Sequence, residues 1–144
     1  MMSPLSTEQE PQEEASELCL DLDRNRKTPA LARAAITGFS ADRGISETTL
    51  ATLNLLVSEI VTNAVIHPDV DQASRLRLYA RIEPTHIHVH VTDQGAGFTP
   101  KPRDPAQFGG GYGLYLLEKA SSSWGVDISG GTTTVWFELT TNAP

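Results

Sequence analysis

Alternation of apolar and polar residues predicts a β-strand in four stretches of the chain. Successive side chains of a strand point to opposite faces, so a period of two gives each strand one apolar face for a core. The predicted strands cover residues 16–22, 74–83, 85–95 and 130–140. Their expected inward residues are Leu18, Leu20, Leu22, Leu76, Leu78, Ala80, Ile82, Ile87, Val89, Val91, Val135, Phe137 and Leu139. A tight turn at Pro84 makes the middle two strands a hairpin.

Three other stretches carry the spacing of three and four residues that is typical of helices. They cover residues 28–44, 46–68 and 111–125. Thr28 and Ser46 are the expected N-caps of the first two helices. The order of elements is strand, two helices, hairpin, loop, helix and strand. We therefore predict an α+β two-layer sandwich, in which helices pack on one face of a mixed, mostly antiparallel sheet.

The second predicted helix places three polar side chains, Glu59, Asn63 and His67, at spacings of four residues. On a helical wheel this polar row overlaps one edge of the apolar stripe. Polar groups in such a position are partly desolvated, which costs free energy unless they find partners. The row therefore either caps neighbouring elements or lines a site.

Acidic residues are concentrated at the start of the chain. The formal net charge is −7, and residues 1–23 hold seven of the 18 acidic side chains and no Lys or Arg. The remainder is formally neutral, which argues against a nucleic-acid binder because such a protein carries a basic face. Residues 1–15 have the composition of a disordered tail, so we predict one folded domain over residues 16–141.

Targeting and redox signals are few. The sequence shows no signal-peptide pattern and no run of 18 apolar residues, so neither export nor membrane association is expected. The single cysteine, Cys19, cannot form an intrachain disulfide and supplies no zinc cluster. Its simplest role is that of a small apolar residue in a strand. A reducing cytoplasm is the expected location.

Two glycine-rich stretches and one inward carboxylate indicate nucleotide chemistry. Asp93 continues the inward row of its strand and is followed by Gly95 and Gly97. A buried carboxylate can accept a hydrogen bond from an exocyclic amine, and glycines let a flat base approach the backbone. The stretch GGGYG at 109–113 precedes a predicted helix, whose N-terminus suits a phosphate chain. An Asn can complete the oxygen shell of Mg²⁺, and a Glu can accept a proton from a hydroxyl or water.

In this order the motifs resemble those of the GHKL ATPase family, whose ATP-binding domains occur in gyrase, MutL, heat-shock chaperones and histidine kinases. Residues 59–68 resemble its N-box, DQGAGF (93–98) and GYGL (111–114) its two glycine boxes, and GGT (130–132) its Gly-Thr strand motif. The resemblance implies a Bergerat-type ATP-binding fold that uses ATP and Mg²⁺. It implies that Glu59 is the catalytic base, Asn63 the Mg²⁺ ligand and Asp93 the contact to the adenine amino group. The other nucleotide-binding residues that it implies are His67, Gly95, Gly97, Phe98, Gly109, Gly110, Gly111, Tyr112, Gly113, Leu114 and Thr132.

Some assignments within these motifs stay open. His67 either lines the nucleotide site or interacts with the end of its helix. Three consecutive threonines leave the register of Thr132 open. The segment between Phe98 and Gly111 is rich in proline and glycine and would close over the phosphates as a lid. Its basic residues are either γ-phosphate contacts or solvated charges; they are Lys101 and Arg103.

The outward face of the predicted sheet is rich in residue types found at interfaces. These residues are Arg75, Arg77, Tyr79, Arg81, His86, His88, His90, Trp136 and Glu138. In the family that the sequence resembles, this layer takes part in homodimerisation, and a homodimer is expected. The three histidines alternate along one strand, where side chains point in parallel, so a surface polar row is favoured over a zinc site.

Within the family, the sequence resembles the bacterial anti-sigma factor serine/threonine kinases. No His precedes the N-box in the position that a histidine kinase needs for its phosphoacceptor, and 144 residues leave no room for a second domain, so neither a histidine kinase nor a protein of the gyrase, MutL or chaperone type is expected. The resemblance implies that the protein sequesters a sigma factor and phosphorylates a Ser or Thr of an anti-sigma factor antagonist. A nucleotide-binding scaffold that sequesters a partner without phosphotransfer is the alternative, and a simple ATPase is a third reading. Glu59 favours the kinase, because a scaffold needs no base.

Overall fold

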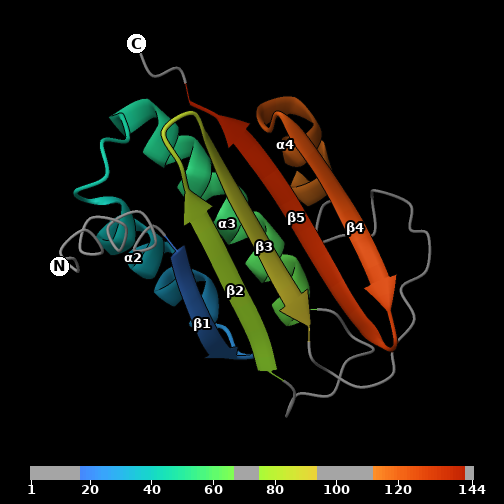
Figure 1. Ribbon diagram of the computed structural model, residues 1–144. Coiled ribbons are helices and arrows are strands. Elements are labelled where there is room, and N and C mark those ends of the chain that lie inside the picture. Colours follow the sequence, from blue (N-terminus) through green and yellow to red (C-terminus); the bar gives the residue numbers. More distant parts are fainter. Residues whose placement is uncertain (1–16, 67–74, 94–111, 142–144) are drawn as a thin grey trace, which may run out of the picture.

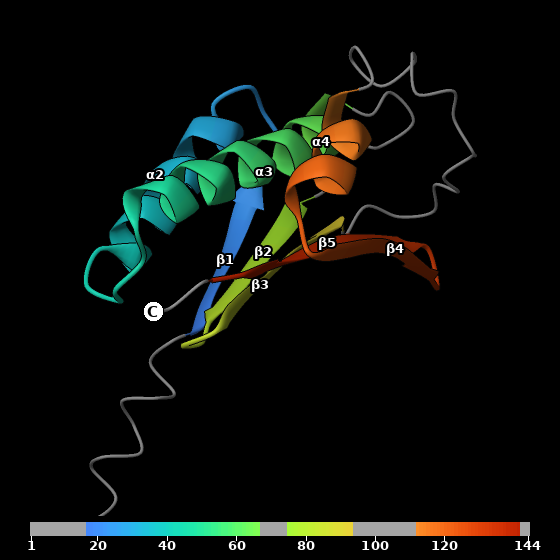
Figure 2. The same cartoon turned by 90° about the horizontal axis from the view of Figure 1, so that it is seen from above.

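The computed structural model describes residues 17–66, 75–93 and 112–141. They form two layers, a sheet and a set of helices that lie on one side of it (Figures 1 and 2). The elements are β1 (Glu17–Asp23), α2 (Thr28–Ser40), α3 (Glu47–Ile66), β2 (Arg75–Ile82), β3 (His86–Asp93), α4 (Tyr112–Ala120), β4 (Ser123–Ser129) and β5 (Thr132–Thr140). The strands pair in the order β1-β2-β3-β5-β4, and every neighbouring pair is antiparallel. The predicted α+β two-layer sandwich is confirmed.

The sequence-based prediction was wrong for one element, strand β4. The third predicted helix extended to residue 125, whereas α4 ends at Ala120 and the chain enters β4 at Ser123. Serine is a weak helix former, and the apolar residues that follow alternate with small or polar ones, as in a strand. The sheet therefore has five strands where four were predicted.

A two-residue turn joins β4 to β5. Gly130 and Gly131 occupy its central positions with φ of +58° and +86°, and Ser129 pairs with Thr132 across it. Two consecutive residues with positive φ are typical of a type I′ turn, whose twist matches that of the two strands. The turn sets the register of β5, and so decides which of its threonines faces the helices.

The first two helices begin differently from one another. In α3 the backbone N–H of Thr49 donates to the Ser46 hydroxyl over 3.1 Å, which confirms Ser46 as N-cap. In α2 the N-cap position is taken by Lys27, so the prediction of Thr28 was wrong. Thr28 is the first residue of the helix itself, and its buried hydroxyl donates to the Asp23 carbonyl. This bond ties the end of β1 to the start of α2.

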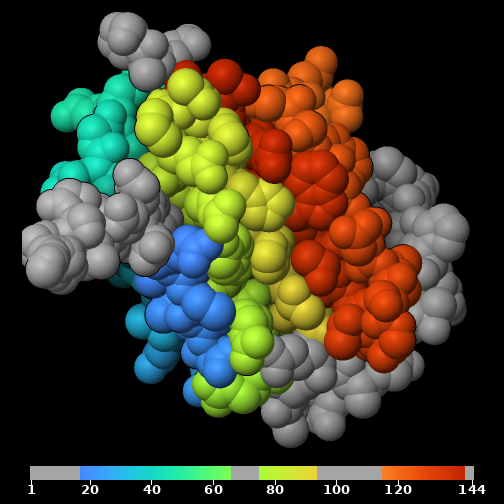
Figure 3. All heavy atoms as spheres, in the orientation of Figure 1, coloured from blue at the N-terminus to red at the C-terminus, as the bar shows by residue number. Residues whose placement is uncertain are grey.

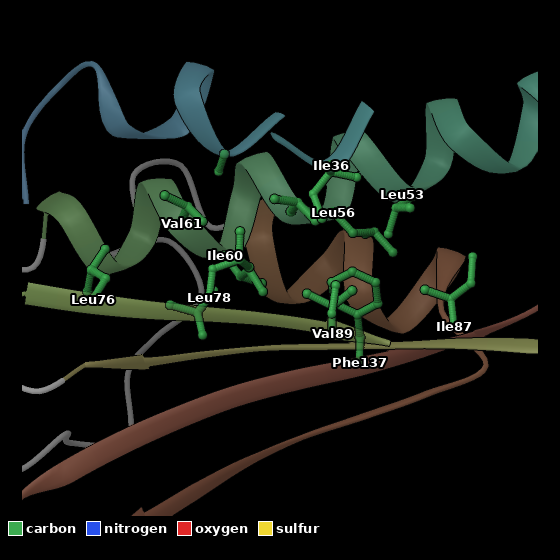
Figure 4. Close-up of a cluster of buried hydrophobic side chains, with 14 of the residues drawn as sticks. Ile36, Leu53, Leu56, Ile60, Val61, Leu76, Leu78, Ile87, Val89 and Phe137 are labelled. Atoms are coloured by element: carbon green, nitrogen blue, oxygen red, sulfur yellow. The ribbon is translucent and has the colours of Figure 1, made fainter. Parts of the chain in front are cut away.

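The core lies between the helices and the inner face of the sheet, meaning the face that the helices cover. All the predicted inward residues of β2 and β3 are buried, as is Phe137 of β5. Figure 4 shows Leu56 and Ile60 of α3 pointing down toward the sheet. Burying one such side chain contributes about 1.5–3 kcal/mol. The residues drawn and labelled there are Ile36, Leu53, Leu56, Ile60, Val61, Leu76, Leu78, Ile87, Val89 and Phe137.

Helix α3 is the most apolar of the described helices. By length and hydropathy alone, its segment Glu47–Val65 is a candidate membrane span. The same segment packs against α2, α4 and β3, and it supplies much of the core. Its apolar character is therefore explained by burial between the sheet and two other helices.

Exposed charged side chains line the outer face of the sheet, the face away from the helices, which is turned to the viewer in Figure 3. Acidic residues of β1 pair there with arginines of β2, directly across the ladder. The pairs, with their N–O distances, are Arg75–Asp23 (2.7 Å), Arg77–Asp21 (3.0 Å) and Arg81–Glu17 (2.6 Å). Hydrogen bonds from Arg81 and then Tyr79 lower the pKa of Glu17. Cys19 lies exposed in the same strand.

Candidate functional site

The inner row of β3 ends in a buried carboxylate. Asp93 is 5% exposed, as the inward pattern of its strand predicted. Its Oδ1 atom accepts a hydrogen bond over 2.5 Å from Nη2 of Arg24, whose side chain is fully buried. A carboxylate has about four acceptor positions, so an arginine and a ligand amine can be bound together. The site therefore has a carboxyl acceptor held in place by a buried arginine.

Arg24 links three elements at this point. It follows β1 directly, pairs with Asp93 at the end of β3, and donates through Nη1 to the carbonyl of Ala64 in the last turn of α3. The last carbonyls of a helix lack partners within the helix, and a cation is favourable there. Sequence reasoning missed Arg24, because the run DRNRK has the character of a solvated turn. Only the tertiary contacts reveal its burial.

The Gly-Thr strand motif contributes a threonine beside the carboxylate. Thr133 stands opposite Asp93 in the β3–β5 ladder, is 9% exposed, and its hydroxyl has no hydrogen-bond partner among the described residues. The hydroxyl of Thr132 donates to the Ser129 carbonyl over 2.8 Å, and that of Thr134 lies 2.9 Å from the Thr92 hydroxyl. The register therefore differs from the expected one: Thr133, and not Thr132, is the residue on the inner face.

An unpartnered buried hydroxyl is costly. Leaving a buried polar group without a hydrogen bond costs about 1–3 kcal/mol. In most proteins such groups are satisfied, and the exceptions call for an explanation. A ligand that bonds both Thr133 and Asp93 supplies one.

Helix α3 brings the predicted Glu59 and Asn63 to the same end of the molecule. Both side chains are half-buried, as expected for residues at the edge of the apolar stripe. No hydrogen bond or ion pair joins either side chain to another described residue. Asn63 directly precedes Ala64, the residue that Arg24 holds, so its helical turn is tied to Asp93. Asn63 and the buried carboxylate therefore belong to one region.

The glycine boxes are only partly within the described residues. Tyr112, Gly113 and Leu114 form the first turn of α4, which starts directly after the predicted triple glycine and packs beside α3 (Figure 2). The remaining predictions lie outside the described residues and stay predictions. They concern His67, Gly95, Gly97, Phe98, Gly109, Gly110, Gly111, the lid between residues 98 and 111, and its Lys101 and Arg103.

Comparison with known proteins identifies the family. The family described as "Histidine kinase-like ATPase domain" matches residues 23–139. The chain belongs to this family. The matched range covers most of the chain and contains Glu59, Asn63, Asp93 and Thr133. It confirms the family that the motifs predicted.

Named relatives of this domain include bacterial regulators. An anti-sigma F factor of Pasteuria penetrans is 37% identical over 70 residues, which cover 47% of each chain. A serine-protein kinase RsbW of Oceanobacillus iheyensis is 29% identical over 117 residues, covering 68% of this chain and 74% of the relative. The match to the first relative thus spans about half of its length.

Solved structures share the fold at low sequence identity. The RsbU and RsbW domains of a Mycobacterium tuberculosis protein align with a TM-score of 0.67 and 20% identity, over 85% of this chain and 32% of that one. The SiaB–SiaC complex from Pseudomonas aeruginosa gives a TM-score of 0.61 and 12% identity, over 97% and 99% of the two chains. These similarities support the two-layer fold and nothing finer.

Proposed function

We propose that this protein is an anti-sigma regulatory factor with ATP-dependent serine/threonine kinase activity. It binds a sigma factor and phosphorylates a Ser or Thr of an anti-sigma factor antagonist. The family match and the names of the two relatives support this proposal. The observation that carries it is the convergence of buried Asp93 and Thr133 with the turn of α3 that bears Asn63.

Adenine is the base that this arrangement fits. Asp93 accepts a hydrogen bond from the exocyclic amine, and the Thr133 hydroxyl bonds the adjacent ring edge. Guanine presents an oxygen where adenine presents an amine, so it would face a carboxylate that cannot donate. Thr133 takes the role first expected of Thr132, whose hydroxyl is held by the β4–β5 turn.

The half-buried residues of α3 suit the phosphate end of the ligand. Asn63 carries an amide oxygen, the type of ligand atom that Mg²⁺ prefers. This side chain makes no hydrogen bond to another described residue. Asn63 would hold the ion through this oxygen, and a bound Mg²⁺ would neutralise phosphate charge. Glu59 lies one turn away on the same helix face, and its carboxylate is the proton acceptor in the proposed reaction.

The chemical step uses Glu59 as the base. The hydroxyl oxygen of the antagonist attacks the γ-phosphorus of ATP, and its proton passes to the Glu59 carboxylate. The bond between the γ-phosphorus and the bridging oxygen breaks, and ADP leaves. The products are a phosphorylated antagonist and a regulator that is free to hold its sigma factor.

Nucleotide binding can be tested at the threonine run. Thr133→Val keeps the shape of the side chain and removes the hydroxyl, so ATP affinity should fall by about 5- to 10-fold, as loss of one net hydrogen bond implies. Thr134→Val is the matched control, because its hydroxyl pairs with Thr92 on the outer face. Calorimetry should show weaker binding for the first variant only, and wild-type protein should prefer ATP to GTP. Equal affinity for ATP and GTP, or an unchanged Thr133→Val, overturns the adenine site.

Catalysis can be tested at Glu59. Glu59→Gln keeps the size of the side chain and removes the base, so phosphate transfer to the antagonist should fall about 10² to 10⁴-fold. ATP affinity and sigma binding should persist. Glu47→Gln in the first turn of the same helix is the matched control, since it removes the same charge far from the site.

The same assay separates the kinase from the scaffold alternative. Wild-type protein is incubated with its antagonist, ATP and Mg²⁺, and the antagonist is analysed by mass spectrometry. If the protein binds a sigma factor but the antagonist is not phosphorylated, the kinase proposal is wrong and the scaffold alternative is supported. If Glu59→Gln transfers phosphate to the antagonist at the wild-type rate, Glu59 is not the catalytic base.

Further elements of this proposal concern assembly and location. The open outer face, with its arginines and aromatic residues, is the surface proposed for homodimerisation (Figure 3). Sedimentation of the purified protein gives its oligomeric state directly. A cytoplasmic location follows from the proposed partners, a sigma factor and its antagonist, which act on transcription.

A further inference from the structure

The outer face of the sheet holds an aromatic cluster at its centre, formed by Tyr79 of β2, His88 and His90 of β3, and Trp136 of β5. His90 stands between Tyr79 and Trp136 in the register of the three strands. The rings of Tyr79 and His90 stack at 4.8 Å and 19°, and those of His88 and Trp136 at 6.0 Å and 21°. Each imidazole is thus held in its orientation by one aromatic partner, His90 by Tyr79 and His88 by Trp136.

The two histidines converge. Side chains two residues apart on a strand start about 7 Å apart and point in parallel, which made a metal site unattractive from the sequence. In the structure, His88 Nε2 lies 3.2 Å from His90 Nδ1, with the rings at 73° to one another. Two imidazole nitrogens bound tetrahedrally to one zinc ion, each at 2.0–2.1 Å, are about 3.3 Å apart. The pair already has the spacing of two ligands of one ion.

A carboxylate stands behind the pair. Glu138 of β5 is paired with His88 in the ladder, and its Oε2 lies 3.0 Å from His88 Nδ1. A carboxylate accepts a hydrogen bond, so it selects the tautomer with the proton on Nδ1 and leaves the lone pair on Nε2. Metal-binding histidines in proteins are oriented by this kind of partner. The lone pair of His88 therefore faces His90.

His90 is available as the second ligand. Its Nδ1 is the atom that contacts His88 Nε2, so the nitrogen that would bind the ion already faces the first ligand. A neutral imidazole carries one N–H, and for metal binding this proton must sit on Nε2 so that Nδ1 presents its lone pair. Moving the proton between the two ring nitrogens changes no net charge. A cation can therefore replace the N–H···N contact without removing a proton from the protein.

We propose that His88 and His90, supported by Glu138, form a binding site for a divalent transition-metal ion of the Zn²⁺ or Cu²⁺ class. Imidazole nitrogen suits these ions, whereas Mg²⁺ prefers oxygen, so the site is distinct from the nucleotide pocket. The described residues contain no group of three or more His, Cys, Asp or Glu that could hold a metal. The other coordination positions are thus open to water or to a donor from a second molecule.

Cu²⁺ is the probe for this site, because it binds nitrogen ligands most tightly among the first-row divalent ions and quenches tryptophan fluorescence. The chain has two tryptophans, so Trp124→Phe leaves Trp136, which stacks on His88, as the sole tryptophan. Titration of this variant with Cu²⁺ should give saturable quenching at one ion per chain, or one per two chains if a second chain supplies ligands. Added Zn²⁺ should restore the fluorescence, since it competes for the site and does not quench.

Variants in the same background assign the ligands. His88→Gln and His90→Gln should each abolish saturable quenching, and Glu138→Ala should weaken Cu²⁺ binding about 10- to 100-fold. His86→Gln is the matched control, because His86 lies on the same face of β3 but contacts Glu83 instead. Circular dichroism checks that each variant is folded. Quenching that does not saturate, or that is unchanged in a folded His88→Gln variant, overturns the site.

Discussion

Both faces of the sheet carry arginine–aspartate pairs, and the inner pair differs from the outer ones above all in its burial. On the inner face, Arg24 and Asp93 have side chains that are 0% and 7% exposed. On the outer face, Arg77 and Asp21 are both 50% exposed. Charges removed from water lose several kcal/mol of hydration each, whereas exposed charges keep theirs and are screened by salt. Loss of one partner should therefore strongly lower stability in the buried pair and change it little in the exposed pair.

This difference shows how one set of strands serves two purposes. Residues facing the helices are apolar until the row ends at Asp93, where polarity returns in a buried setting. Residues facing water form a ladder of cross-strand charges and aromatic rings. A polar group is informative about function on the first face, because burial makes it costly, and much less so on the second.

Breaking the buried pair should have the largest effect on stability. Arg24→Met removes the cation and leaves the Asp93 carboxylate buried, so the free energy of unfolding should fall by about 3–5 kcal/mol. Urea denaturation followed by circular dichroism measures it. The double variant Arg24→Met/Asp93→Asn should lose less than the two single variants together, because no uncompensated charge remains. An additive double variant would contradict coupling of the two residues.

Truncating the core beside the pair should come next. Leu78 is fully buried on the inner face of β2, and Leu78→Ala leaves a cavity under α3. The expected loss is about 2–5 kcal/mol in the free energy of unfolding, measured in the same way. A loss below 1 kcal/mol would mean that the helices do not pack here as described.

The neighbouring residue on the opposite face should matter far less. Arg77→Ala removes the exposed pair with Asp21 and should change the free energy of unfolding far less than Leu78→Ala does, because both charges are already in contact with water in the folded protein. The effect should shrink further in 1 M NaCl, since salt screens exposed charges. Arg77 and Leu78 are adjacent in β2 but point to opposite faces of the sheet. Comparing the two variants therefore shows how strongly the loss of stability depends on which face a side chain occupies.

The smallest effect is a pH dependence at His90. Burial lowers its pKa in the folded state, so the unfolded chain binds the proton more readily. Its contribution is present above the ordinary histidine pKa of about 6.5 and is lost as the pH falls toward the lowered value. Stability measured between pH 7 and 5 should decline less in His90→Gln than in wild type. The titratable group that contacts this ring is His88, whose Nε2 lies 3.2 Å from His90 Nδ1 and whose own Nδ1 lies 3.0 Å from Glu138 Oε2.

The sequence was a good guide to the strands that bear the site. Alternation predicted the inward rows of β2 and β3, including Asp93, because a slip of one residue would turn every apolar side chain to water. The edge of the apolar stripe predicted the half-burial of Glu59 and Asn63. These features depend on the local periodicity of apolar residues, which can be recognised from the sequence alone.

Features that depend on contacts between distant segments were missed. Arg24 is buried through residues 40 and 69 positions away, and nothing in its charged neighbourhood indicates this. The convergence of the histidines depends on rings stacked from two adjacent strands. Both of these cases are tertiary in origin. The inward position of Thr133 is different, because the inward row of Val135, Phe137 and Leu139 extends to it by alternation, whereas the expected contact was placed one residue earlier, at Thr132.

Strand β5 is the last of the described strands in the chain, yet it lies inside the sheet, between β3 and β4. Its ladder with β3 joins residues such as His88 and Glu138, which are 50 positions apart, whereas β2 and β3 are joined by a short turn. Closing the longer loop costs more chain entropy, so this pairing is the slower step in folding. Until it forms, β3 has an unpaired edge and the core lacks Phe137. A growing or refolding chain is therefore most prone to aggregate just before its final strand is inserted.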